Sequence, residues 1–188
     1  YLLKHIIYLD GLFHKYKSEA KYDFLTGLNN VRSYDIVFDQ FVKDIVREND
    51  YISLMMIDMY FFKKVNDNYG HENGDLVLKE LAGILQKASR RFDFVSRMGG
   101  EEFSVLLPYC TLNQALEVAE RIRSTVASHK FVLSSGNSIE VTISIGLSCY
   151  PETTKDISAL KQQADRALYK SKKDGRNRVS TLGDNYMD

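Results

Sequence analysis

The sequence predicts an α+β protein in which helices pack over a mainly antiparallel sheet. Segments with the apolar spacing of helices alternate with short apolar runs that are bounded by polar residues. Two of these runs are joined by Gly99-Gly100, a pair that can take the positive φ angles of a tight hairpin turn. A length of 188 residues suits one domain with a single sizeable core.

We expect residues 1–21 to form a linker or stalk helix. Its apolar residues recur at alternating steps of four and three, which places them on one seam: Leu2, Ile6, Leu9, Phe13, Tyr16 and Ala20. The seam suits either a partner helix in a parallel dimer or the surface of the chain's own domain. Because the seam is short and contains Gly11, both interpretations stay open. Since the chain begins at Tyr1 within this pattern, we expect an upstream sensor or membrane region in the full-length protein.

The remaining elements are expected in a regular succession. A turn signal over 22–28 precedes a helix that ends at about Arg47, and the apolar run 51–57 predicts a buried strand that ends in Asp58. The later elements are a helix over about 74–89, two strands over 93–107, a helix over about 112–128, strands near Phe131 and over 139–149, a helix over about 157–173 and a short strand near Val179.

Charge and cysteine content exclude several classes of protein. Twenty-five Lys and Arg balance 25 Asp and Glu, so the chain lacks the broad positive field that binds nucleic acid. Cys110 and Cys149 lie far apart in the sequence without metal-ligand spacing, which argues against a disulfide framework and a zinc site. No apolar run approaches the roughly 20 residues that cross a bilayer. We therefore expect a cytoplasmic domain in a reducing compartment.

Three carboxylates form the candidate site. Asp58 ends a buried strand, and Glu101 and Glu102 follow the glycine turn. Neighbouring strands lie about 4.8 Å apart, so these acids converge if the hairpin pairs beside the Asp58 strand. Two carboxylates about 4 Å apart repel by roughly 4 kcal/mol at an effective dielectric constant of 20, and a hard divalent cation such as Mg²⁺ relieves that repulsion. Such an ion would activate a 3′-hydroxyl and neutralise an α-phosphate, which predicts nucleotidyl transfer. The alternative is an ordinary hairpin tip with solvated acids.

The segment Arg97-Met-Gly-Gly-Glu-Glu-Phe103 resembles the signature loop of the GGDEF domain (diguanylate cyclase) family. Four other blocks stand in the family's order: Asp23-Phe-Leu-Thr-Gly-Leu28, Asp58-Met-Tyr-Phe-Phe-Lys-Lys-Val-Asn-Asp67, Tyr69-Gly-His-Glu-Asn-Gly-Asp75 and Ala164-Asp-Arg-Ala-Leu-Tyr-Lys-Ser-Lys-Lys-Asp-Gly-Arg-Asn177. The resemblance implies a palm-like fold related to polymerase and nucleotide cyclase cores. It implies a catalytic domain over 22–182, with 183–188 as a C-terminal tail.

The resemblance also implies an activity. A diguanylate cyclase condenses two GTP molecules into cyclic di-GMP and releases pyrophosphate. Each domain holds one GTP and two domains must face each other, so a homodimer is implied. The implied cofactor is Mg²⁺, with Mn²⁺ as an alternative, and cyclic di-GMP is the implied product inhibitor. The implied setting is the cytoplasmic side of a bacterial protein that can be membrane-anchored.

Roles at the reacting centre follow position by position from the resemblance. The implied metal ligands are Asp58, Glu101, Glu102 and the main-chain carbonyl of Met59, and the implied catalytic residues are Glu101, Glu102 and Lys63. The implied triphosphate contacts are Lys63, Lys172, Arg176 and the main-chain N–H groups of Phe61 and Phe62. Gly99 and Gly100 would let the loop lie close to the nucleotide.

Two further pairs of residues have implied roles. Asn66 and Asp75 resemble the pair that reads guanine, since a carboxylate accepts from the N1 and N2 donors of guanine and an amide meets its remaining edge. Helix capping is the alternative for both. Arg90 and Asp93 resemble the family's inhibitory Arg-x-x-Asp site, with a charged helix end as the alternative.

The chain departs from the family pattern at two positions. The first metal segment commonly reads Asp-x-Asp, whereas Tyr60 stands at the second acidic place here. Val31 stands where the opening motif often has Arg. The rival hypothesis is therefore a catalytically weak or inactive GGDEF-like domain that binds GTP or cyclic di-GMP and signals by occupancy. A third hypothesis, a related cyclase that makes a mixed or adenine product, is disfavoured by Asp75.

Overall fold

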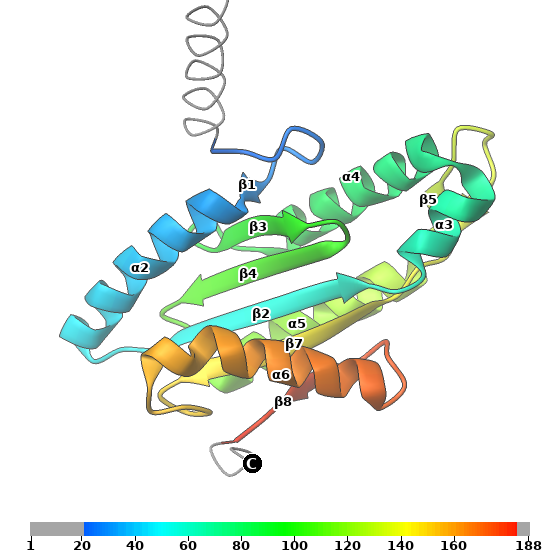
Figure 1. Ribbon diagram of the computed structural model, residues 1–188. Helices are drawn as coiled ribbons and strands as arrows, with labels where there is room; N and C mark the ends of the chain where they lie inside the picture. The colour runs from blue at the N-terminus through cyan, green and yellow to red at the C-terminus, as the bar shows by residue number, and fades with distance from the viewer. Residues whose placement is uncertain (1–20, 184–188) are drawn as a thin grey trace, which may run out of the picture.

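The computed structural model describes residues 21–183 and confirms the predicted α+β class. A six-stranded sheet has the order β1-β3-β4-β2-β7-β8, and helices cover both of its faces (Figure 1). The expected stalk helix, apart from Lys21, and the tail from residue 184 onward lie outside the described residues. Within residues 21–183, no helix has the length and apolar character that a bilayer span requires.

Most of the elements follow the expected succession. Their bounds are β1 Asn29–Asn30, α2 Val31–Glu48, β2 Ile52–Met59, α3 Phe62–Tyr69, α4 His71–Ala88, β3 Phe94–Gly99, β4 Glu102–Pro108, α5 Leu112–Ser128, β5 Phe131–Val132, β6 Ser138–Ile139, β7 Ile143–Tyr150, the short 3₁₀ helix η1 Ile157–Ala159, α6 Leu160–Lys173 and β8 Val179–Thr181. In the main sheet, β2 pairs antiparallel with β4 and β7, and β3 pairs antiparallel with β4. The edge strands β1 and β8 pair parallel with their neighbours.

Four segments differ from the sequence expectation, and the first is the two-residue edge strand β1, which was not expected. The helix α3 was not expected, because its eight residues bury only Val65 and give a weak apolar pattern. The helix α4 begins at His71 rather than near residue 74, since Gly70 with a φ of 84° separates it from α3. The strand expected over 139–149 is divided, because Ser138–Ile139 pairs with β5 in a separate two-stranded sheet.

The alternation of side chains along β2 divides the core into two layers. Met55 and Ile57 belong to the larger cluster, which includes the apolar faces of α4 and α5. Leu54 and Met56 belong to the second cluster, which includes residues of α2 and α6. Asp58 continues the register of Leu54 and Met56, so its carboxylate lies on the α6 side of the sheet.

The helix α6 packs unusually close to β7. A Cβ added at Gly146 would lie 2.1 Å from the main-chain N of Leu168 and 2.2 Å from the main-chain O of Ala164. Two buried serine hydroxyls hold the helix in this position, because Ser148 donates to the Leu160 carbonyl and Ser171 donates to the Ile145 carbonyl, each over 2.7 Å. The C-terminal half of α6 is thereby fixed beside the end of β2.

The two cysteines, distant in sequence, lie close together in the structure. Both thiols are free and buried, and Cys149 Sγ lies 3.7 Å from the main-chain O of Cys110. Burial raises the pKa of Cys149 to about 12 and also raises the pKa of Cys110. Both thiols are therefore protonated at neutral pH and poorly nucleophilic.

Candidate active site

The predicted acids lie at the same end of the sheet. Asp58 pairs with Glu102 across the antiparallel β2–β4 ladder, and the Met59 N–H donates to the main-chain O of Glu101 over 3.2 Å. The β3–β4 hairpin therefore lies beside the Asp58 strand, as the convergence of these acids requires. The end of β2, the β3–β4 turn and the C-terminal end of α6 all lie at this end of the sheet (Figure 1).

The glycine turn between β3 and β4 has a backbone that L-residues rarely adopt. Gly99 and Gly100 have φ angles of 149° and 50°. Arg97 fixes this shape, because its Nε and Nη2 donate to the main-chain O of Gly100 over 3.0 and 2.8 Å. The same guanidinium donates through Nη1 to Asp23 over 3.1 Å. The turn is thus tied to the opening motif of the domain.

Asp23 is held as a carboxylate in this contact. Its Oδ1 accepts from the N–H and the hydroxyl of Thr26 over 2.9 and 2.6 Å. Partial burial alone would raise the pKa of Asp23, but the hydrogen bonds from Thr26 and Arg97 lower it. Asp23 and Arg97 each stand in a motif of the sequence, but the sequence alone predicts no role for either. The only available signal was two opposite charges in motifs that are 74 residues apart.

Lys172 pairs with the predicted metal ligand Asp58. Its Nζ lies 2.7 Å from Asp58 Oδ2, and the Asp58 side chain is only 16% exposed. Sequence reasoning gave the two residues separate roles, and the close packing of α6 on β7 brings them together. The ammonium supplies the positive charge that a carboxylate with so little exposure requires.

A further carboxylate of α6, Asp165, lies within electrostatic reach of the same acids. Burial is the main reason that the pKa of Asp165 is raised, and the negative charge of Glu102 raises it further. The positive charges of Lys161 and Lys172 act in the opposite direction. The raised pKa of Asp165 therefore reflects mainly its burial, with only a minor part from Glu102.

The chemistry of the donors suits a hard divalent ion. The predicted ligands are carboxylate oxygens and the Met59 carbonyl, which Mg²⁺ prefers over nitrogen or sulfur. Across residues 21–183, the side chains of His, Cys, Asp and Glu form no preassembled group of three or more ligands. An ion bound by these carboxylates would therefore need main-chain, water or phosphate oxygens to complete its shell.

The predicted guanine-reading residues come from two consecutive helices. Asn66 lies on α3 and Asp75 on α4, with Gly70 between the helices. Asn66 Oδ1 is buried and has no hydrogen-bond partner within the described residues. A Cβ added at Gly74 would lie 1.9 Å from that oxygen, so only glycine leaves room for the amide. An unpaired buried acceptor is costly, and a ligand N–H would satisfy it.

The predicted phosphate contacts surround the start of α3. Phe61 has a φ of 65° and precedes the first helical residue, so the N–H groups of the first turn are open to an anion. Lys63 is exposed in that turn. Phe62 packs against the larger core cluster, whereas Phe61 is 45% exposed. Arg176 also has a left-handed φ, 62°, and its guanidinium lies over the ring of Tyr60.

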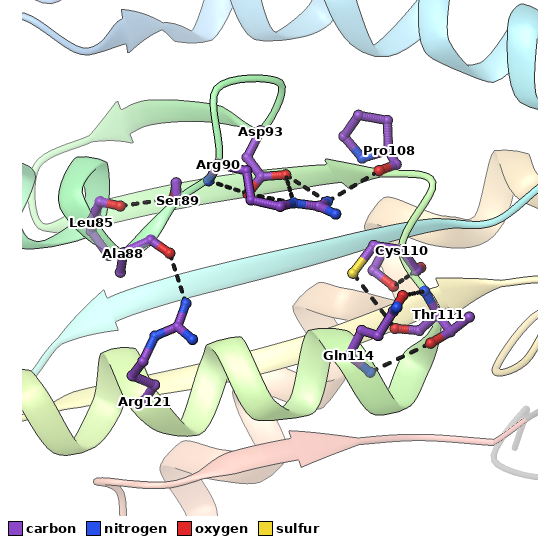
Figure 2. Close-up of polar contacts among 11 residues, drawn as sticks. Leu85, Ala88, Ser89, Arg90, Asp93, Pro108, Cys110, Thr111, Gln114 and Arg121 are labelled. Atoms are coloured by element: carbon purple, nitrogen blue, oxygen red, sulfur yellow. Dashed lines mark hydrogen bonds and ion pairs between the residues drawn. The ribbon is translucent and has the colours of Figure 1, made fainter.

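The predicted inhibitory pair is closed on itself. Asp93 accepts from the Arg90 main-chain N–H over 2.6 Å and from its Nε and Nη2 over 3.0 and 2.8 Å (Figure 2). Nη2 also donates to the Pro108 carbonyl over 3.2 Å. The hydrogen bond to Asp93 is the main reason that the pKa of Arg90 is raised. The Asp93 side chain is 1% exposed and that of Arg90 is 51% exposed, so a ligand would meet the arginine first.

An apolar groove lies beside this pair. Its volume is about 340 Å³, and its lining consists of Phe41, Arg90, Phe92, Pro108 and Tyr109. Phe92 is 75% exposed and Tyr109 is 47% exposed. Aromatic side chains beside a guanidinium offer a surface that suits a planar base with an attached phosphate.

Comparisons with known proteins identify the family. The family model described as "Diguanylate cyclase, GGDEF domain" matches residues 20–178. Diguanylate cyclase A of Treponema denticola is 46% identical over 134 residues, which cover 71% of this chain and 36% of that protein. The Bacillus subtilis protein YhcK is 43% identical over 180 residues, which cover 95% of this chain and 50% of that protein. The chain thus spans half or less of the length of these relatives.

A solved structure agrees with both the sequence and the fold. The GGDEF domain of DgcB from Caulobacter crescentus, determined in complex with c-di-GMP, superposes with a TM-score of 0.81 at 30% identity. The superposition covers 86% of this chain and 95% of that one. On these findings, with the hairpin and the acids where the motif order predicts them, the chain belongs to the GGDEF domain family of diguanylate cyclases.

Proposed function

We propose that this domain is a Mg²⁺-dependent diguanylate cyclase that joins two GTP molecules into cyclic di-GMP with release of pyrophosphate. The observation that carries the proposal is the β2–β4 register, in which Asp58 stands opposite Glu102 and beside the Glu101 turn. The adjacent Lys172 and the open first turn of α3 supply positive charge for a triphosphate.

The residues of the chain would divide the work. The ion would be held by Asp58, Glu101, Glu102 and the Met59 carbonyl, and when bound it would lower the pKa of the 3′-hydroxyl and neutralise charge on the α-phosphate. The triphosphate would be held by Lys63, Lys172, Arg176 and the N–H groups of Phe61 and Phe62. The turn at Gly99 and Gly100 would lie close to it. Asn66 and Asp75 would read guanine. The attacking oxygen forms a bond to the α-phosphorus as the bond to pyrophosphate breaks.

A single domain would supply only half of the reaction. Each GTP must present its 3′-hydroxyl to the α-phosphate of the other, so we propose a homodimer as the active species. Upstream segments of the full-length protein, including the proposed stalk and a sensor or membrane region, would then set the rate by controlling proximity.

The test is a product assay on the domain fused to a forced dimer. Incubation with GTP and Mg²⁺ should yield cyclic di-GMP, which mass spectrometry identifies.

A second candidate function, a GTP- or cyclic di-GMP-binding module without turnover, is favoured by Tyr60 in place of the usual acid. Tight GTP binding with no dinucleotide product would select that module and refute the cyclase.

Gly74→Ala should damage guanine recognition. The new methyl group would overlap Asn66 Oδ1, so the amide must leave its place. Loss of one hydrogen bond to a buried group costs about 1–3 kcal/mol, so we expect GTP affinity to fall by roughly fivefold to 150-fold. Discrimination against ATP should fall as well. Isothermal calorimetry with both nucleotides measures these changes.

Gly83→Ala is the matched control for that variant. Gly83 lies on the same helix, and an added Cβ would meet no atom within 4 Å. Alanine there should leave GTP binding unchanged and raise stability by up to about 1 kcal/mol through helix propensity. If Gly74→Ala and Gly83→Ala bound GTP equally well, Asn66 would have no role in guanine recognition.

Arg90→Ala should relieve product inhibition without lowering the initial rate, since we propose that Arg90 and Asp93 form the inhibitory site. The apparent inhibition constant for added cyclic di-GMP should rise by about tenfold or more, because a charged hydrogen bond is worth about 1.5–3 kcal/mol. The neighbouring exposed Arg91 gives the control, since Arg91→Ala removes the same charge without touching Asp93. Unchanged inhibition in Arg90→Ala would show that the Arg90–Asp93 pair is a structural contact and not an inhibitory site.

A further inference from the structure

Tyr60, which stands at the usual second acidic place of the first metal segment, contacts one of the predicted phosphate-binding cations. The guanidinium carbon of Arg176 lies 4.6 Å from the centroid of the Tyr60 ring. A cation within about 6 Å of a ring centroid is attracted by the electron-rich face of the ring. Among residues 21–183, Arg176 forms no ion pair with a carboxylate, so this ring is the partner that holds its charged end.

Both members of the contact are anchored through the main chain. The Tyr60 N–H donates to the Thr142 carbonyl over 2.8 Å, directly after the strand that carries Asp58. The Arg176 N–H donates to the Ser171 carbonyl over 2.9 Å at the end of α6. The next residue, Asn177, accepts from Arg123 over 2.7 Å. The side chain of Arg176 therefore extends from a fixed loop toward a fixed ring.

The Tyr60 ring is itself held by a second aromatic residue. The centroids of Tyr60 and Phe61 lie 3.5 Å apart. Lys64 Nζ covers the Phe61 ring at 4.1 Å from its centroid. Each of the two rings thus contacts one cation where β2 leads into α3: Phe61 contacts Lys64 and Tyr60 contacts Arg176.

We propose that Tyr60 is a positioning residue that holds the Arg176 guanidinium ready for the triphosphate of the nucleotide. This inference rests on the proposed GTP site. An acid at position 60 would pair with Arg176 and neutralise it, whereas the neutral phenol attracts the guanidinium and leaves its full charge and its outer N–H donors for phosphate oxygens. The substitution of the usual acid thus strengthens phosphate binding while it removes a carboxylate.

The test measures binding of α,β-methylene GTP, which cannot be cleaved at that bond, to the full chain in the presence of Mg²⁺. Tyr60→Leu removes the ring and should weaken binding by roughly threefold to tenfold. Tyr60→Phe keeps the ring and should bind as the wild type does. Tyr51→Leu, the same change at the opposite end of β2, is the control and should have no effect.

A double-mutant cycle separates positioning from a general structural role. In an Arg176→Ala background, Tyr60→Leu should weaken binding no further, because the partner of the ring is already gone. An equal loss in both backgrounds, or wild-type affinity in Tyr60→Leu, would overturn the inference and leave the GTP site standing. Absence of binding by the wild type would instead overturn the GTP site, and the inference with it.

Discussion

Glu101→Gln is expected to reduce the rate of cyclic di-GMP formation by about 10³-fold or more, which corresponds to about 4 kcal/mol of transition-state stabilisation. Gln keeps the size of the side chain and removes the negative charge that would bind the divalent ion. A carbonyl oxygen of an amide is a much weaker ligand than a carboxylate when the ion must also neutralise developing charge on phosphate. Steady-state synthesis by a forced dimer, followed by chromatography, measures the effect.

The fold should tolerate this change. Glu101 contributes its main-chain O to the Met59 N–H, and that bond does not depend on the side chain. Within residues 21–183, the Glu101 carboxylate has no hydrogen bond or ion pair that Gln would break. The melting temperature should therefore match that of the wild type.

The matched control for Glu101→Gln lies on a helix, away from the glycine turn. Glu117 is exposed on α5, and Glu117→Gln makes the same chemical change away from the proposed site. This control should retain full activity. A Glu101→Gln enzyme that is as active as Glu117→Gln would exclude Glu101 from the reacting centre.

The strand assignments that place the acids were predictable from local sequence. The run 51–57 is apolar on both faces because β2 lies between β4 and β7 in the middle of the sheet, and Asp58 marks where that burial ends. The Gly99-Gly100 pair likewise marks the hairpin, since few other residues accept its φ angles. Convergence of the acids followed from one assumption, that these two strands are neighbours.

Contacts between distant segments were not predictable in the same way. The ion pair of Lys172 with Asp58 and the contact of Arg97 with Asp23 depend on how α6 and the opening turn dock, which no local pattern encodes. Gly74 gave one weak signal, because glycine inside a helix costs up to about 1 kcal/mol relative to alanine. The closed Arg90–Asp93 pair also emerged only from the structure, since the pattern Arg-x-x-Asp does not show whether its two charges face each other or a ligand.

Gly146→Ala is expected to lower the free energy of unfolding by about 3 kcal/mol, the upper end of the usual cost of overpacking. The added methyl would lie within 2.2 Å of main-chain atoms of Ala164 and Leu168, so α6 must move away from β7 as a unit. Urea denaturation followed by circular dichroism measures the loss. Gly83→Ala adds the same methyl group in open space and should not lower stability.

Displacement of α6 should also separate Lys172 from Asp58, so the variant that remains folded should bind GTP more weakly. Truncation of a neighbouring side chain tests the cause of both effects. Because the methyl group meets the backbone of α6, adding Ala164→Gly to Gly146→Ala should not restore stability. Recovery in that double variant would show that side chains set the distance between α6 and β7. The close approach of the α6 backbone to β7 would then no longer explain why Lys172 reaches the end of β2.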